Sequence, residues 1–158
     1  MNTLSTWVPN LKDTSIKKRR EAAVHLGKSA DLSAIPFLVD TLSDPHPGVR
    51  SDVVQALGRL GDSSAVAALI ACLDDPDPMV RAAAIAAIGR IKDRDAVMPL
   101  IGCLHDKEIL IRVGAAEVLG KLSDRRALGP LKNLLEHDLY AEVREAAEAA
   151  IKRIQAKT

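Results

Sequence analysis

Histidine and cysteine are the side chains of this sequence best suited to bind metals or attack substrates, and their spacing predicts no such site. The cysteines Cys72 and Cys103 stand 31 residues apart, and no histidine is followed by Glu. A metal site needs several ligands that converge, and His105 alone does not complete a shell around the cysteines. We therefore expect no catalytic residue, no metal and no cofactor, and we interpret both cysteines as small apolar core residues.

The same interval of 31 residues recurs along the whole chain. A fixed period between about 20 and 50 residues indicates one supersecondary unit that is copied and stacked, which predicts a solenoid. Four columns of identical residues keep this period: Arg19, Arg50, Arg81 and Arg112; Asp31, Asp62, Asp93 and Asp124; Gly27, Gly58, Gly89 and Gly120; and Ala34, Ala65, Ala96 and Ala127.

Each copy contains two apolar patterns with helical spacing, which predict a helix A followed by a helix B. Asp62, before the second pattern, is suited to cap the N-terminus of helix B, because its carboxylate can accept from free backbone N–H groups. The pairs Asp44-Pro45 and Asp75-Pro76 predict turns that lead to the next helix A. In the second copy the patterns are Val49, Val53, Val54, Ala56, Leu57 and Leu60 for helix A, and Ala65, Val66, Leu69, Ile70 and Leu73 for helix B.

The glycine column lies near the end of each helix A. Leu57 and Leu60 continue the apolar face on either side of Gly58. We therefore expect the glycine inside the last turn of helix A, at a cost of about 1 kcal/mol in helix propensity. Its small size would let helix B approach closely.

Written out, the repeated unit reads V-R-x-x-A-a-x-A-L-G-K/R-L-x-D-x-x-A-V-x-x-L-I-x-x-L-x-D, most clearly from Val80 to Gly89 and from Asp93 to Val97. It resembles the short HEAT-like repeat first associated with phycobilisome lyases. The resemblance implies an all-α fold, a right-handed α-solenoid or superhelix of stacked HEAT-like helix pairs with about ten helices. It also implies that the arginine and aspartate columns bridge neighbouring repeats as a structural ladder. Function stays open, because the family includes scaffolds, chaperones, lyase subunits and a few enzymes.

We expect a single HEAT-like repeat domain over residues 1–158. Lys18 and Glu148 stand at core positions of the repeat near the two ends, and charge at such positions is typical of capping units. We therefore expect a capped and complete stack. Its predicted parts are an N-terminal half repeat at 3–12, full repeats at 16–44, 47–75, 78–106 and 109–137, and a C-terminal half repeat or cap at 139–155.

Composition limits the compartment and the partners. The chain is 47% hydrophobic and 27% charged, with a net charge of +1, so it has no bulk attraction to nucleic acid or to anionic membranes. The longest apolar run, from Ala65 to Leu73, is far shorter than the roughly 20 residues of a membrane span. Two cysteines make no disulfide framework, and no signal pattern begins the chain. We expect a cytoplasmic protein that does not bind membranes.

Charged columns offer one alternative function. A second basic column lies near the C-terminal ends of helices A, where the helix dipole favours cations. This column would form a basic edge opposite an acidic edge of Asp44, Asp74, Asp75, Asp77, Asp106 and Glu108. Nucleic-acid backbone binding is the less favoured reading, since the aromatic residues lie toward the two ends of the chain. The basic column consists of Lys28, Arg59, Arg90, Lys121 and Arg153.

The predicted function depends on the surface. Positions of helix B opposite the core are expected to line a concave, smooth trough that suits a helix or an extended peptide. We interpret the chain as a non-catalytic scaffold that binds a protein or peptide there, with a phycobilin lyase-like or phycobilisome-associated chaperone or lyase subunit as the alternative. The predicted partner-binding residues are Pro36, Asp40, Ala67, Ala71, Asp74, Met98, Gly102, His105, Gly129 and Asn133. A second smooth patch, on helices A, suits self-association: Ala82, Ala83, Ala86, Val113 and Gly114.

Overall fold

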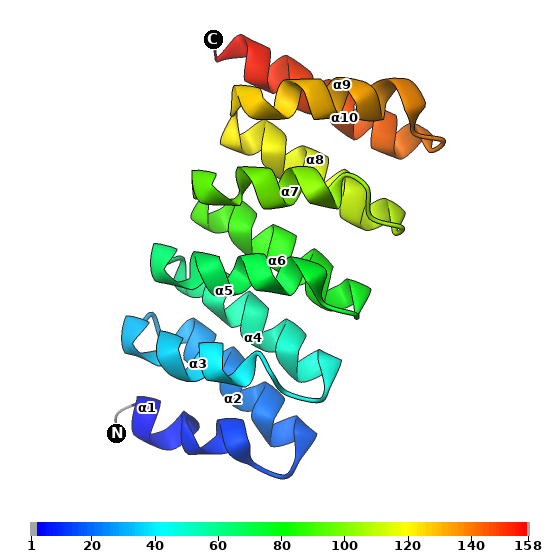
Figure 1. Cartoon of the computed structure of the whole chain (residues 1–158). Helices are drawn as coiled ribbons and strands as arrows, with labels where there is room; N and C mark the ends of the chain where they lie inside the picture. Colours follow the sequence, from blue (N-terminus) through cyan, green and yellow to red (C-terminus); the bar gives the residue numbers. More distant parts are fainter. Residues whose placement is uncertain (1–2, 158) are drawn as a thin grey trace. The chain divides into compact units, whose positions relative to one another are not determined.

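Long and short helices alternate along the chain (Figure 1). The computed structural model describes residues 3–157, and within that range it contains ten α-helices and no strand, which confirms the all-α solenoid class. The long helices are the predicted helices A, and the short ones are the predicted helices B. The long helices are α2 (Ile16–Lys28), α4 (Pro47–Leu60), α6 (Pro78–Ile91), α8 (Ile109–Leu122) and α10 (Ala141–Ala156). The short helices are α1 (Thr3–Trp7), α3 (Ile35–Thr41), α5 (Val66–Ala71), α7 (Val97–Cys103) and α9 (Leu128–His137).

Four of the short helices start with a 3-10 turn that an aspartate caps. The Asp62 carboxylate accepts a hydrogen bond of 2.9 Å from the backbone N–H of Ser64, as the sequence predicts. Asp31, Asp93 and Asp124 cap the corresponding turns in the same way. These turns are η2 (Leu32–Ala34), η3 (Ser63–Ala65), η5 (Arg94–Ala96) and η6 (Arg125–Ala127), and two further turns are η1 (Pro9–Lys12) and η4 (Cys72–Asp74).

The helices form two compact units, the first ending at Ile91 and the second beginning at Lys92. In the first unit α4 packs between α2 and α6, and Figure 1 shows α3 and α5 in front of this layer. In the second unit α10 packs against α8 and α9, and α7 packs against α8. Fully buried aliphatic side chains form each core: Leu26, Leu57 and Ile88 in the first unit, and Leu100, Leu119 and Ile154 in the second.

Gly27, Gly58 and Gly120 lie inside their long helices, as predicted, but they face a different neighbour. A Cβ atom on Gly58 would lie 2.6 Å from the Cβ of Ala87, and one on Gly27 would lie 2.6 Å from the Cα of Ala56. Both alanines belong to the next long helix. The expectation that these glycines make room for helix B is therefore wrong. They make room for the next helix A, because the long helices pack with almost no space between their backbones.

Each of four long helices is followed by a residue in the left-handed backbone region. These residues are 31 positions apart: Ala30 (φ 56°), Gly61 (φ 72°), Lys92 (φ 62°) and Ser123 (φ 53°). A left-handed residue is a common helix stop, and glycine adopts it without steric cost. Only Gly61 in this column is a glycine, so the stop signal and the predicted glycine column are separate features.

The N-terminal segment consists of α1 and η1. The α-helix ends at Trp7, and Pro9 begins the 3-10 turn. The ring of Trp7 stacks on His25 of α2, with centroids 3.9 Å apart and planes 6° from parallel. This stack fixes α1 against the first long helix.

Candidate functional site

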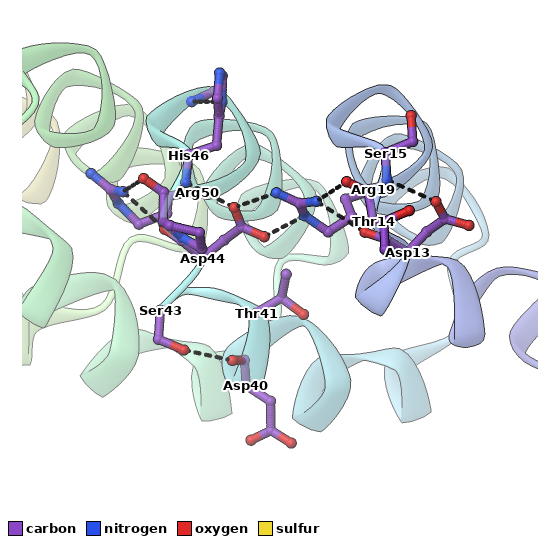
Figure 2. Close-up of polar contacts among 12 residues, drawn as sticks. Asp13, Thr14, Ser15, Arg19, Asp40, Thr41, Ser43, Asp44, His46 and Arg50 are labelled. Atoms are coloured by element: carbon purple, nitrogen blue, oxygen red, sulfur yellow. Dashed lines mark hydrogen bonds and ion pairs between the residues drawn. The ribbon is translucent and has the colours of Figure 1, made fainter.

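Two arginines hold each of three turns that lead from a short helix to the next long helix. At the turn between α3 and α4, Arg19 donates to both oxygens of the Asp44 carboxylate at 2.6 and 3.1 Å (Figure 2). Arg50 donates to the Asp44 carbonyl at 2.9 Å. Arg50 then binds the Asp75 carboxylate with two bonds of 2.8 Å, and Arg81 donates to the Asp75 carbonyl at 2.9 Å. We call this chain of contacts the arginine row.

The second unit repeats this arrangement. Arg112 donates to the Asp138 carboxylate at 2.8 and 3.2 Å, and Arg144 donates to the Asp138 carbonyl at 2.8 Å. The Arg112 guanidinium also lies 5.6 Å from the centre of the Tyr140 ring, within range of a cation–π contact. The one-residue insertion before α10 shifts the carboxylate from the expected register, and Asp138 takes the place that the 31-residue period gives to His137.

The paired carboxylates are buried and ionised. Only 6% of the Asp44 side chain and 10% of the Asp75 side chain are exposed. Burial raises the pKa of each, but the arginine hydrogen bonds and the backbone N–H two residues on outweigh it, so both pKa values lie below the ordinary one. For Asp138 the Arg112 hydrogen bond is the largest cause, and its pKa is also lowered. Each of these ion pairs therefore neutralises its two charges and stabilises the turn.

The row corrects the predicted ladder, which paired the arginine column with the Asp31 column. Arg19 lies in the first turn of α2, whereas Asp31 follows the other end of that helix. A helix of this length separates the two by about 20 Å, so they cannot meet. Asp31, Asp62, Asp93 and Asp124 cap short helices instead, as described above. The period of 31 residues also relates Asp44 to Asp75, and this signal identifies the true partners in the sequence.

The predicted acidic edge also changes. Asp44 and Asp75 are neutralised by Arg19 and Arg50, so they add no free negative charge to that edge. Asp74, one residue before Asp75, remains exposed. The acidic character of this side of the first unit therefore depends on the remaining carboxylates of the predicted edge, such as Asp74, and not on Asp44 or Asp75.

All ten predicted partner-binding residues are exposed. In the first unit they lie on α3, α5 and η4, and in the second unit on α7, α9 and the residues just after α7. A Cβ atom added to Gly102 or Gly129 would meet nothing within 4 Å, so these positions face open space. Met98 is 57% exposed.

Sequence reasoning missed two apolar residues on the short helices of the first unit. Leu32 is 49% exposed and Phe37 is 43% exposed. Phe37 directly follows Pro36, which the sequence pattern places on the exposed side of the helix. This neighbouring position was the signal that could have identified Phe37 as exposed. We call the exposed side of these short helices the unit 1 B face; it consists of Leu32, Pro36, Phe37, Asp40, Ala67, Ala71 and Asp74.

The second unit has a hollow of 290 Å³ beside its predicted residues. His105 and Asn133 line it, together with His137 and the buried Arg112–Asp138 pair. The Nδ1 atom of His137 lies 3.0 Å from the Asn133 carbonyl oxygen. The hollow therefore offers polar side chains, in contrast to the small residues around Ala67 and Ala71.

Grooves between long helices form the other candidate surface. A groove of 420 Å³ between α4 and α6 has a floor of alanines, including Ala82, Ala83 and Ala86, and Met79 and Arg90 also line it. The groove of 530 Å³ between α2 and α4 is lined mostly by polar and charged residues: Lys17, Arg20, Glu21, His25 and Asp52, with Ile16 and Val24. Of the residues predicted for self-association, Ala82 and Ala86 are exposed, and Ala83, Val113 and Gly114 are half-buried.

Both cysteines lie in the core, away from solvent. Cys72 and Cys103 are free and buried, and burial raises the pKa of Cys72 to about 11, so this thiol stays protonated at neutral pH. Within residues 3–157, no three His, Cys, Asp or Glu side chains converge as metal ligands. In the same range, every buried side-chain polar atom has a hydrogen-bond partner. No helix there has the length and apolar character that crossing a membrane requires.

A solenoid of paired helices with capped turns defines a class of repeat protein, and comparison with known families identifies it. The HEAT repeat model matches residues 4–81 and 66–152, so the chain belongs to the HEAT repeat family. Its repeats are of the short type first recognised in phycobilisome lyases. No curated protein matches the sequence significantly.

Solved structures agree with this assignment. The complex of CpcE and CpcF of phycocyanin lyase from Nostoc sp. contains a chain with 26% identity and a TM-score of 0.84, aligned over 99% of this chain. The match spans 66% of that neighbour's length. A designed armadillo repeat protein in complex with the peptide (KR)4 has 24% identity and a TM-score of 0.72, covering 96% of this chain and 81% of its own. An engineered protein has 22% identity and a TM-score of 0.70, covering 98% of this chain and 80% of its own.

Proposed function

We propose that this chain is a binding scaffold that holds a partner protein or peptide on the exposed side of its short helices. The observation that carries the proposal is the exposure of small residues there. Ala67 and Ala71 in the first unit and Gly102 in the second are exposed on helices whose other side is core. Small side chains let a partner backbone or helix approach closely, and apolar area gives it affinity.

The family supports a binding role, since HEAT repeats build scaffolds. The neighbour from Nostoc is one chain of a two-protein complex. A second candidate function follows from the same neighbour: a subunit of a bilin lyase-type assembly, acting on a tetrapyrrole or on its carrier protein. The identity of 26% over 99% of this chain favours it. Under this candidate the short helices would still bind a protein, and the chemistry would require a second chain.

The decisive experiment is affinity capture from the source organism with three forms of the full chain. The first is the unaltered protein. The second carries Ala71→Lys and Gly102→Lys, which place one long charged side chain on the short helices of each unit. The third carries Ala82→Lys, which adds the same side chain at an exposed position of a long helix. We expect the captured partner to be lost with the double variant and kept with Ala82→Lys.

The same variants separate binding from self-association. Sedimentation velocity should show the same size for the double variant and the unaltered protein. If the protein self-associates through α6, Ala82→Lys should reduce its size instead. A partner that binds the double variant as well as the unaltered protein would contradict the proposed surface. For the lyase candidate, the captured complex should also carry bilin absorbance, and its absence would remove that candidate alone.

A further inference from the structure

The short helices of the first unit carry an excess of negative charge. Residues 29–46 and 61–78, which contain α3, α5 and their turns, include no lysine or arginine. The same part of each repeat in the second unit is mixed, with Lys92, Arg94 and Lys107 in one copy and Arg125, Arg126 and Lys132 in the next. The charge difference is therefore specific to the first unit.

Most carboxylates of these two segments already have partners. Asp44 and Asp75 bind arginines, and Asp31 and Asp62 cap short helices. Asp77 accepts from the backbone N–H of Met79. After these are set aside, two exposed carboxylates remain, Asp40 and Asp74, and neither makes an ion pair within the described residues. Figure 2 shows the Asp40 side chain pointing away from the arginine row.

Asp40 lies beside the exposed apolar residues of α3. Phe37 and Asp40 are three positions apart, so they occupy the same side of the helix, and Pro36 completes that side. Ala67 and Ala71 lie on α5, and Asp74 lies three positions after Ala71 in the 3-10 turn η4 that follows this helix. In both places an apolar surface is therefore followed by an exposed carboxylate.

This pattern fits one kind of side chain especially well. Lysine and arginine have a long apolar stem and a charged end, and they cover apolar surface while the charge stays in water. A stem lying on Phe37 would bring its cation to Asp40, and an arginine would also gain a cation–π contact with the ring. Neighbouring apolar side chains of the same segment would cover Leu32, Pro36 and Ala67.

We propose that the unit 1 B face binds a cationic segment of a partner protein, one in which lysine or arginine alternates with apolar residues. This inference rests on the proposed function and adds to it the chemistry of the partner. An acidic segment would be repelled by Asp40 and Asp74. A purely basic segment would leave Phe37 and Leu32 uncovered.

A phage-displayed library of random short peptides, selected against the full chain, tests the inference. We expect the selected peptides to be enriched in Lys and Arg together with Leu, Ile or Phe. Asp40→Asn combined with Asp74→Asn should weaken their binding about tenfold, since two exposed charge contacts are lost. Added salt should weaken binding to the unaltered protein, because exposed charges are screened.

Two matched variants control for general effects. Glu21→Gln removes an exposed carboxylate from α2, so it changes the net charge by the same amount as either Asn substitution alone. Because Glu21 lies outside the unit 1 B face, this variant should leave peptide binding unchanged. Ile16→Ala removes an apolar side chain that is 42% exposed on α2, and it serves as the control for Phe37→Ala. We expect Phe37→Ala to weaken binding severalfold and Ile16→Ala to have no effect.

The outcomes distinguish this inference from the proposed function. Peptides that lose binding with Ala71→Lys but show no basic enrichment, and no response to the two Asn substitutions, would overturn the inference and leave the scaffold function standing. Selection that yields no peptide sensitive to Ala71→Lys, Gly102→Lys or Phe37→Ala would contradict both. If Glu21→Gln weakened peptide binding as much as the Asn substitutions do, the peptides would be attracted only by the net charge of the protein. That result would also overturn the inference.

Discussion

A Cβ atom on Gly58 would lie 2.6 Å from the Cβ of Ala87 and 2.8 Å from its Cα, so α4 and α6 touch almost backbone to backbone. Gly58→Ala should therefore force the two helices apart. Overpacking of this kind costs about 1–3 kcal/mol, which exceeds the gain of about 1 kcal/mol in helix propensity. Urea unfolding should show a lower free energy of unfolding for this variant.

Gly102→Ala is the matched control for that substitution. It makes the same chemical change in α7, where a new Cβ meets nothing within 4 Å. Only the propensity gain applies there, so this variant should be as stable as the unaltered protein or up to about 1 kcal/mol more stable. Equal responses of the two variants would contradict the close contact of α4 with α6.

Arg50 joins two turns, since it binds the Asp75 carboxylate and the Asp44 carbonyl. Arg50→Lys keeps the positive charge but loses the planar guanidinium group, which donates to the carboxylate and the carbonyl at the same time. We expect it to lower the free energy of unfolding by about 2 kcal/mol, because buried acceptors lose their donors. Arg59→Lys changes an exposed arginine at the end of α4 and should stay within about 0.5 kcal/mol of the unaltered protein. A similar loss in both variants would show a general preference for arginine.

The buried carboxylates predict how stability responds to acid. The pKa of Asp75 in the folded protein lies below its ordinary value of 3.8. A lowered pKa stabilises the folded state above that ordinary value, and the stabilisation is lost as the pH falls through the folded pKa. Urea unfolding at about pH 7 and about pH 3 should therefore show lower stability in acid. Asp75→Asn should be destabilised at neutral pH, and its difference from the unaltered protein should shrink in acid. A constant difference would exclude the ion pair as the cause.

The sequence predicts the helices well because the repeat period fixes the register of every core position. Identical spacing of Val49, Val80 and Ile111 identifies one buried column, and all three are buried. The turn chemistry of Asp62 was predictable for the same reason, since an aspartate before an apolar pattern has one favoured local role. Periodicity does not say which columns meet in space. The arginine column has two aspartate columns at the same interval, and only the direction of each helix decides between them.

The candidate surface was predictable in position but not in character. Exposure follows from the side of each short helix that faces away from the core, so Pro36, Ala67 and Ala71 were identified from spacing alone. The free charge of Asp40 could not be separated from the neutralised charge of Asp44, because both are aspartates in one segment of the chain. Their difference depends on Arg19, which lies 25 positions before Asp44.

The left-handed residues after the long helices could not be recognised from residue types. Ala30, Gly61, Lys92 and Ser123 have similar positive φ angles but chemically different side chains. An L-residue in this region costs about 1–2 kcal/mol relative to glycine. Ala30→Gly should therefore raise the free energy of unfolding by about 1 kcal/mol, after the extra entropy of glycine in the unfolded chain is subtracted. Gly61→Ala makes the reverse change at the equivalent position and should destabilise by a similar amount. Thermal and urea unfolding of both variants test this, and a loss of stability with Ala30→Gly would contradict the left-handed stop after α2.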